Sequence, residues 1–287
     1  MAAEGPRHAV ITADDHGALL AMATWFLTCT LVLCTATRLI VRFTTRHVPG
    51  IDDALVVVAA ALSIGSAIAI SLAVNNGLGR RLYLLGAFSL SQIQKEIYAA
   101  TILYILAVGM SKISMSWFLA RLAGEAVHKV AVVILSSVVV AWTIAVTFGF
   151  AFQCKLPRPW DVHGGKCISI MAFWIGAAII DIATDIVMIA LPIHIVWNLQ
   201  LGFREKATVC FIFVIRLILI IVSILRLVYL PGLFTSDPTF DSIPYGIATQ
   251  CHSTLSVIIA CTPALKPFID NVKSGMLDMS LAPHATG

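Results

Sequence analysis

Charged residues are scarce in this chain. Asp, Glu, Lys and Arg make up 12% of its 287 residues, and hydrophobic residues make up 59%. Soluble domains carry about 25% charged residues. The formal net charge of +4 is modest, so we expect no nucleic-acid partner. This composition excludes an ordinary soluble domain and predicts a protein that lies in the lipid bilayer.

Several chemical motifs are also absent. The histidines and cysteines show no His-x-x-x-His or Cys-x-x-Cys spacing, so we predict no metal site. The stretch Gly77–Gly79 is not followed by Lys-Ser or Lys-Thr and follows no predicted strand, so it is not a phosphate-binding loop. No nucleophile–base set stands out. The sequence favours a protein that is not an enzyme, and it leaves open whether the protein has a catalytic activity.

Seven long apolar runs are present, against about 20 residues needed for a helix to cross the bilayer. Four contain no charged residue and hold 21 or more residues each: Gly17–Thr37, Ala54–Gly79, Val130–Gln153 and Ser242–Leu265. Three reach that length only by including charges: Gln92–Ala120, Ile168–Trp197 and Ala207–Tyr229. The fold class predicted from these runs is all-α, a polytopic membrane protein with a seven-transmembrane-helix bundle.

The loops predict the topology. With the N-terminus outside, the inner connections hold nine Lys and Arg residues and the outer ones hold seven, a weak positive-inside bias. Basic residues at span ends are expected to reach the headgroups. We expect residues 1–16 to form a short outer tail rather than a cleavable signal peptide, residues 17–265 to form the transmembrane domain, and residues 266–287 to form a cytoplasmic tail.

Helix ends and cysteines add local predictions. Asp52 and Asp53 should open the second helix, because acidic side chains bind free N–H groups there, and Gly77 should follow its end in a left-handed cap. Cys154 and Cys167 are the only loop cysteines. Both fall on the predicted outer side, where disulfides persist, so we predict a disulfide between them.

Ionisable residues lie within four of the predicted spans. Charges at bilayer depth are costly, about 2.5–3.5 kcal/mol each, so proteins keep them where they pair or line a cavity. From the rise of 1.5 Å per residue, these side chains approach a common depth: Lys112, Asp181, Asp185, Arg216 and His252. Two interpretations stay open: a salt-bridge and hydrogen-bond network that fixes helix packing, or a functional site that is a polar pocket or a proton-linked switch. His252 either titrates near neutral pH or stays neutral and donates to a carbonyl.

An ordered set of short motifs resembles the fungal rhodopsin-like integral membrane proteins, the family that contains the SAT4-type proteins and a group of receptor-like proteins. The motifs run from Ile51 to Pro267 and comprise Asp52-Asp53, Gly77-Leu78-Gly79-Arg80, Lys112-Ile113-Ser114, Arg121, Phe152-Gln153-Cys154, Gly165-Lys166-Cys167, Asp181, Thr184-Asp185, Leu191-Pro192, Arg226, Tyr229, Asp237-Pro238-Thr239 and Pro263-Ala264-Leu265-Lys266-Pro267. The resemblance implies a seven-helix membrane protein. His252 stands where the family often has an acidic residue, and Arg216 where a small or apolar residue is expected.

A retinal cofactor is not expected. A retinal Schiff base needs a lysine in the last span, and none lies between Ser242 and Leu265. Classical receptor motifs are also missing, because Arg121 follows Phe118-Leu119-Ala120 rather than standing in Asp-Arg-Tyr. An inner-face contact from Arg121 to Asp52 and Asp53 stays open beside simple capping.

The leading functional hypothesis is a non-catalytic, receptor-like, multi-pass protein of the plasma membrane or an endomembrane that binds a small hydrophobic or amphipathic molecule. The polarity of the ligand site would be set by Lys112, Asp181, Asp185, Arg216 and His252, with Arg226 and Tyr229 at the outer rim. The alternative is a membrane-embedded tailoring enzyme or carrier serving a secondary metabolite, with Asp185 and His252 as acid/base candidates. A third possibility is a scaffold whose charges are purely structural.

Overall fold

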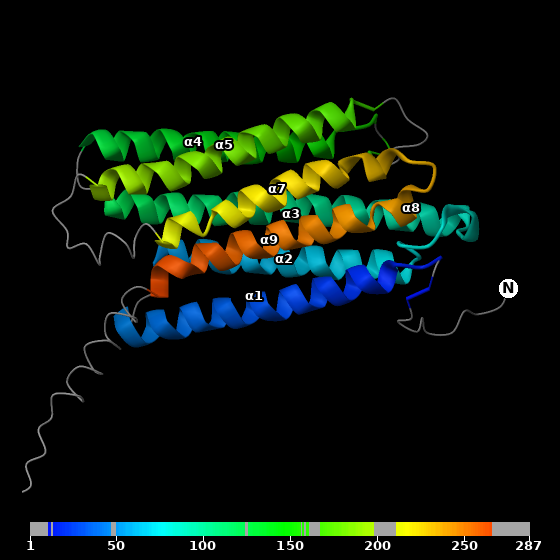
Figure 1. Cartoon of the computed structure of the whole chain (residues 1–287), viewed down its shortest axis with the longest axis horizontal. Helices are drawn as coiled ribbons and strands as arrows, with labels where there is room; N and C mark the ends of the chain where they lie inside the picture. Colours follow the sequence, from blue (N-terminus) through cyan, green and yellow to red (C-terminus); the bar gives the residue numbers. More distant parts are fainter. Residues whose placement is uncertain are drawn as a thin grey trace, which may run out of the picture.

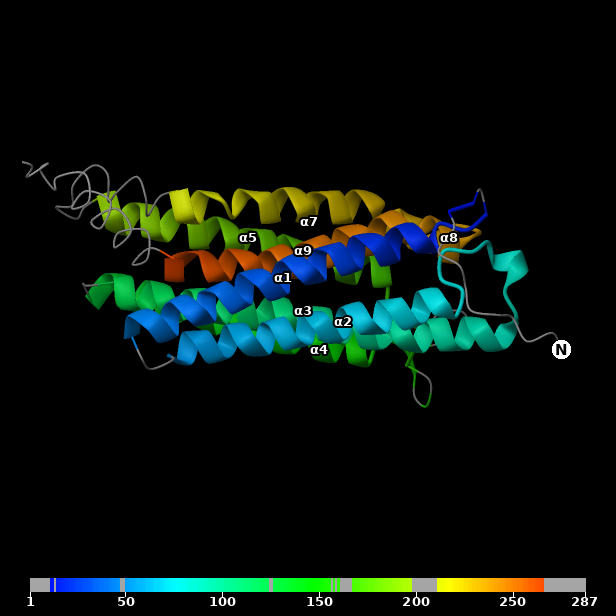
Figure 2. The same cartoon turned by 90° about the horizontal axis from the view of Figure 1, so that it is seen from below.

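The computed structural model describes residues 11–12, 14–46, 50–123, 126–155, 157, 159–160, 167–197 and 211–265. Within them, long helices lie side by side with their axes roughly aligned (Figures 1 and 2). The helices are α1 (Gly17–Arg46), α2 (Ile51–Asn75), α3 (Ala87–Leu122), α4 (Ala126–Ala151), α5 (Ile170–Trp197), α7 (Leu217–Tyr229), α8 (Pro238–Asp241) and α9 (Ile243–Cys261), with short 3-10 turns η1 (Leu82–Leu84), η2 (Leu230–Phe234) and η3 (Thr262–Leu265).

Six helices of the described part are long and apolar enough to cross a membrane, by length and composition. They are Gly17–Thr44, Ile51–Asn75, Ala87–Arg121, Ala126–Ala151, Ile170–Ile195 and Phe211–Phe234. The last predicted span, which contains α9, is not among them, although α9 lies within the bundle in both views (Figures 1 and 2). The predicted all-helical architecture is therefore confirmed for the described residues, and six of their helices are long and apolar enough to span a membrane.

The polar side chains of α9 explain its lower hydropathy. The polar groups of this helix face other helices rather than the outside of the bundle. The buried polar residues are Gln250, His252, Ser253, Thr254 and Ser256. The outer surface of the bundle is apolar instead: Phe26 on α1 is 74% exposed, as suits a lipid-facing helix.

The second helix begins and ends as predicted. Asp53 Oδ2 accepts a hydrogen bond from the backbone N–H of Gly50 at 3.0 Å, next to the positive end of α2. Gly77 has a φ of +118°, and Leu78 N–H donates to the Ala73 carbonyl at 2.9 Å. This left-handed glycine cap stops α2.

The sixth span contains a local irregularity at Arg216. The N–H of Arg216 donates to Phe213 O at 3.1 Å, and Leu219 N–H donates to Arg216 O at 2.9 Å. These bonds join residues three apart instead of four, so the helix tightens there into a 3-10 turn. Arg216 has no exposed surface. The tightened turn therefore carries a fully buried cation.

Four segments lie largely or wholly outside the described residues: the N-terminal tail, the loop before the sixth span, most of the loop between Cys154 and Cys167, and the C-terminal tail.

Candidate functional site

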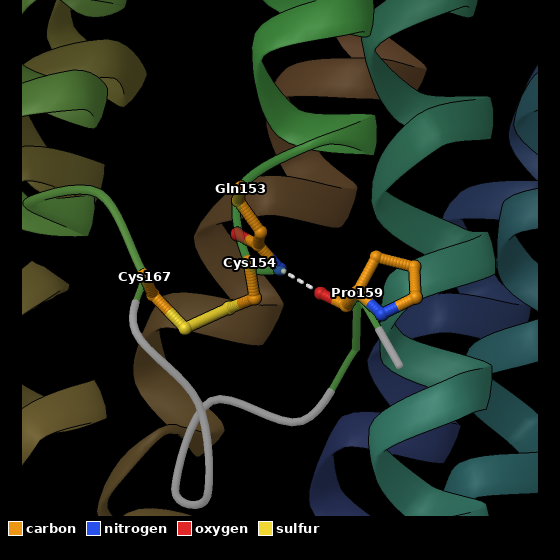
Figure 3. Close-up of a disulfide and its surroundings, with 4 residues drawn as sticks. All are labelled: Gln153, Cys154, Pro159 and Cys167. Carbon is orange, nitrogen blue, oxygen red and sulfur yellow. Dashed lines mark hydrogen bonds between the residues drawn. A yellow bond between two sulfur atoms is a disulfide. The ribbon is translucent and has the colours of Figure 1, made fainter. Parts of the chain in front are cut away.

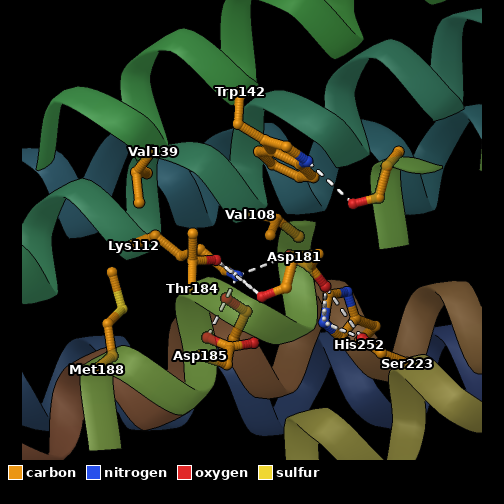
Figure 4. Close-up of polar contacts among 12 residues, drawn as sticks. Val108, Lys112, Val139, Trp142, Asp181, Thr184, Asp185, Met188, Ser223 and His252 are labelled. Atoms are coloured by element: carbon orange, nitrogen blue, oxygen red, sulfur yellow. Dashed lines mark hydrogen bonds and ion pairs between the residues drawn. The ribbon is translucent and has the colours of Figure 1, made fainter. Parts of the chain in front are cut away.

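Lys112 of α3 binds two carboxylates of α5 (Figure 4). Its ammonium lies 2.7 Å from Asp181 Oδ1 and 3.2 Å from Asp185 Oδ1. It also donates to Thr184 Oγ1 at 2.9 Å and to the Asp181 carbonyl at 2.8 Å. Asp181 and Asp185 share one face of α5 because they are four residues apart. All of these groups are at most 6% exposed, so they form a dehydrated ion-pair cluster.

Arg216 extends the cluster toward the end of the bundle where α9 terminates. Its guanidinium lies 3.6 Å from Asp185 Oδ1 and contacts the sulfur of Met188. Within the part of the chain that the structure describes, its Nε and Nη2 atoms, and Oδ2 of Asp185, have no hydrogen-bond partner. This half of the cluster is therefore less well satisfied than the Lys112 half.

His252 of α9 joins the cluster from the opposite side. Its Nε2 lies 3.4 Å from Asp181 Oδ2 and 3.1 Å from Ser223 Oγ, and Ser223 donates to Asp181 Oδ2 at 3.0 Å. Its Nδ1 pairs with the hydroxyl of Tyr104 at 2.9 Å. The imidazole thus links the carboxylate to a phenol in a continuous buried relay.

Arg226 of α7 continues the relay. It donates to Tyr104 Oη at 2.7 Å and to Tyr245 Oη at 2.8 Å. Its guanidinium carbon lies 4.4 Å from the ring centre of Trp174, 4.7 Å from that of Tyr104 and 5.2 Å from that of Tyr245. Cation–π contacts of this kind stabilise a buried guanidinium.

The structure brings together six of the seven residues predicted to set the ligand site. Lys112, Asp181, Asp185, Arg216 and His252 form the cluster, and Arg226 reaches it through Tyr104. Tyr229 does not join them, since its side chain is 43% exposed at the end of α7. Sequence reasoning missed Tyr104, Ser223, Trp174 and Tyr245, which carry no charge and resemble ordinary core residues in the sequence.

The same side chains have a geometry that also suits a cation. Ligand atoms of Asp181, Asp185 and His252 lie within 4.8 Å of one another. The ammonium of Lys112 stands between the two carboxylates and supplies positive charge at the position a metal ion would need. The donor set therefore fits an ion-pair cluster better than a metal site.

A cavity of about 190 Å³ lies beyond Arg226, at the disulfide end of the bundle. Most of its lining is apolar, including Leu90, Ile93 and Ile97 of α3. Its polar lining includes Gln250, whose amide donates to Ser66 Oγ at 3.2 Å. Cavities with mostly apolar walls and a few fixed polar groups are typical of small-molecule sites.

The cavity and the charged cluster are adjacent and distinct. Tyr245 and Trp174 line the cavity and also contact Arg226. The cluster residues Lys112, Asp181 and His252 do not belong to the described lining. Arg226 is therefore the residue that links the two.

The predicted disulfide is present between Cys154 and Cys167 (Figure 3). The adjacent Gln153 accepts a hydrogen bond from Ile168 N–H at 2.9 Å and donates its own amide to the Pro159 carbonyl at 3.4 Å. Gln153 and Trp160 both line the cavity. The disulfide therefore holds one wall of the cavity.

A second ion-pair network lies at the opposite end of the bundle. Arg38 of α1 binds Asp53 at 2.8 Å and Asp52 at 3.1 Å, and it donates to the Ala260 carbonyl of α9. Arg42 binds Asp52 at 2.9 Å. The expectation that basic residues at span ends reach the headgroups is wrong for Arg38 and Arg42, which are 2% and 7% exposed, because the two aspartates at the start of α2 pair with them. Arg121 also contacts Asp52, at 3.0 Å, so the contact between Arg121 and Asp52 that the sequence left open exists.

These features define a multi-pass helical membrane protein with a buried charged core and an adjoining cavity. Residues 37–271 match the fungal rhodopsin domain, and the chain belongs to this family. It is similar to a SAT4 family membrane protein of Emericella nidulans, with 30% identity over 186 residues that cover 62% of this chain and 47% of the relative.

Two further relatives carry names taken from biosynthetic gene clusters. The polyenoic acids biosynthesis gene cluster protein Ba17b of Metarhizium anisopliae is 26% identical over 198 residues, covering 62% of this chain and 52% of the relative. The phomoidride biosynthesis cluster protein H of a fungal species is 26% identical over 195 residues, covering 62% and 56%. The chain spans about half the length of these curated relatives. No solved structure matches the chain.

Proposed function

We propose that this chain is a receptor-like membrane protein that binds a small apolar or amphipathic molecule in the cavity between α2, α3, α5 and α9. The observation that carries the proposal is the mostly apolar cavity of about 190 Å³ with Tyr245 and Trp174 in its wall. Through these two side chains a bound molecule would act on Arg226, and through Tyr104 on the buried cluster. In this proposal the charged cluster lies behind the cavity wall and sets the electrostatic potential there, without lining the cavity itself. The cluster comprises Lys112, Asp181, Asp185, Arg216 and His252.

The proposal includes seven crossings with the N-terminus outside. At 1.5 Å per residue the 19 residues of α9 extend about 28 Å, close to the hydrocarbon thickness of about 30 Å. The disulfide supports an outer location for its end of the bundle, because disulfides persist outside the cytosol. The sequence of α9 contains no lysine, so the proposed ligand is not a retinal Schiff base on that helix.

The size of the cavity limits the ligand. An apolar cavity of about 150 Å³ holds benzene, whereas drug-sized ligands occupy about 300–1,000 Å³. The proposed ligand therefore has on the order of ten non-hydrogen atoms, which makes octan-1-ol a suitable probe.

Filling the cavity tests the proposal. Thr249 lines the cavity, and its hydroxyl donates to the carbonyl four residues earlier at 2.8 Å. Thr37 makes the same bond at 2.8 Å but is exposed on the outside of α1, so Thr37→Phe is the matched control. Octan-1-ol should raise the thermal midpoint of the wild type and of Thr37→Phe, and leave Thr249→Phe unchanged. Equal shifts in all three proteins would place the binding in the surrounding lipid or detergent and refute the proposal.

The names of the two cluster relatives favour a second candidate, a tailoring enzyme or carrier for a secondary metabolite. In this candidate His252 and Asp185 would act in proton transfer. Asp185→Asn in the source organism distinguishes the candidates. Loss of a metabolite with retained octan-1-ol binding would favour the enzyme or carrier, and an unchanged metabolite profile would favour the receptor.

A further inference from the structure

Arg226 is a buried cation that pairs with no carboxylate in the described part of the chain. Its side chain is 8% exposed, and its hydrogen bonds go to the hydroxyls of Tyr104 and Tyr245. Its Nε atom has no hydrogen-bond partner among the described residues. Among the described residues, no Asp or Glu side chain forms an ion pair with it. A buried guanidinium in this condition is costly unless something else compensates its charge.

The charges in the centre of the bundle do not balance. Lys112 and Arg216 are paired with Asp181 and Asp185, so their charges cancel. Arg226 then contributes one positive charge in excess. A protonated His252 would increase the excess, so the conclusion holds in either state of the histidine.

The excess charge lies directly behind the cavity wall. On the cavity side the hydroxyl of Tyr245 accepts a hydrogen bond from Arg226 Nη2 at 2.8 Å, and the ring of Trp174 covers the guanidinium. Both rings line the cavity. The described lining contains no Asp or Glu, so an anion entering the cavity meets no repelling carboxylate. The walls farther from Arg226, including Leu90 and Ile93, suit an alkyl chain.

We infer that the ligand of the proposed site is an amphipathic monocarboxylate, whose carboxylate compensates Arg226 and whose apolar chain fills the cavity. A monoanion matches the single excess charge. The hydroxyl of Tyr245, which lines the cavity and accepts from Arg226, can donate its own hydrogen to a carboxylate there. Hydrogen bonds that involve an ionised group are about twice as strong as neutral ones. This inference rests on the proposed function and adds the chemical class of the ligand.

The test compares three probes with the same alkyl chain on wild-type protein in nanodiscs: octanoate, octan-1-ol and octylamine. Octanoate should bind at least about ten-fold more tightly than octan-1-ol, as a charge-assisted hydrogen bond predicts. Octylamine should bind most weakly. Equal binding of octanoate and octan-1-ol would overturn the carboxylate assignment and leave the proposed function standing. If octanoate and octan-1-ol each bind equally well to the wild type and to Thr249→Phe, the proposed function itself is refuted. Stabilisation by sodium chloride alone, as large as that by octanoate, would also overturn the assignment.

Variants at Arg226 assign the preference to this residue. Arg226→Gln should remove the preference for octanoate while octan-1-ol still binds, and Arg226→Lys should keep part of it, because the charge remains and the planar guanidinium is lost. If Arg226→Gln does not fold, Tyr245→Phe removes one donor and should lower the octanoate preference alone. An unchanged octanoate preference in all folded variants contradicts the inference.

Discussion

Lys112→Met should be among the most destabilising single changes in the bundle. The ammonium contacts carboxylate oxygens of Asp181 and Asp185 at 2.7 and 3.2 Å, and its side chain has no exposed surface. Methionine is an unbranched side chain one heavy atom shorter than lysine, and it removes the charge. The substitution leaves two buried carboxylates with too little positive charge around them, and breaking a buried pair in this way costs about 3–5 kcal/mol.

A second variant, at Asp181, separates the effect of lost charge from the effect of changed packing. Asp181→Asn removes one carboxylate and leaves the shape nearly unchanged. Combined with Lys112→Met, it restores the charge balance, so the double variant should be more stable than the sum of the two single losses by about 1–3 kcal/mol. The unfolding free energy is measured by SDS titration in mixed micelles. The control is Lys95→Met, the same change at an exposed position of the same helix, which should cost less than about 1 kcal/mol.

A cycle that is additive within about 0.5 kcal/mol would mean that Lys112 and Asp181 do not interact. A loss for Lys112→Met no larger than that for Lys95→Met would refute the ion-pair cluster altogether.

Three further predictions concern other parts of the bundle. Removing the disulfide with Cys154→Ser should lower the unfolding free energy by about 3 kcal/mol in the loop-entropy model and should weaken octan-1-ol binding; a reducing agent that leaves the wild-type thermal midpoint unchanged would contradict this. Arg38→Ala should cost about 3–5 kcal/mol because it leaves two buried carboxylates with too little positive charge around them, whereas Arg121→Ala should cost at most about 1 kcal/mol because its side chain is 42% exposed; equal losses in SDS titration would contradict the second ion-pair network. Gly109→Ala should cost about 1–3 kcal/mol, since its new methyl group would meet Thr143 across the α3–α4 contact, while Gly176→Ala meets no neighbour within 4 Å; similar thermal midpoints for the two variants would contradict that packing.

The spans could be predicted because they depend on composition and length alone. The six helices that meet the criteria follow from runs of apolar residues, and the contact between Lys112 and Asp181 follows from their shared depth. The predicted seventh span, which contains α9, is not among those six, because the buried Gln250 and His252 lower its hydropathy. Composition does not distinguish a span with an inward polar face from a shorter, more polar helix.

The cavity and the second ion-pair network could not be predicted. The cavity depends on side chains from several helices and two loops, and no local sequence pattern encodes a space between them. Arg38 and Arg42 follow an apolar run, a pattern that suits both headgroup contact and ion pairing; only the fold places Asp52 and Asp53 beside them. The tightened turn at Arg216 has no proline or glycine to signal it.

The central claim is that the cavity binds an amphipathic molecule next to Arg226. It is tested most directly by a crystal structure of the protein soaked with 8-bromooctanoate, in which anomalous scattering locates the bromine. We predict a bromine peak inside the cavity near Leu90 and Ile93, with the carboxylate in contact with Arg226 or Tyr245. Bromine peaks confined to the lipid-facing surface, with none in the cavity, would contradict the account.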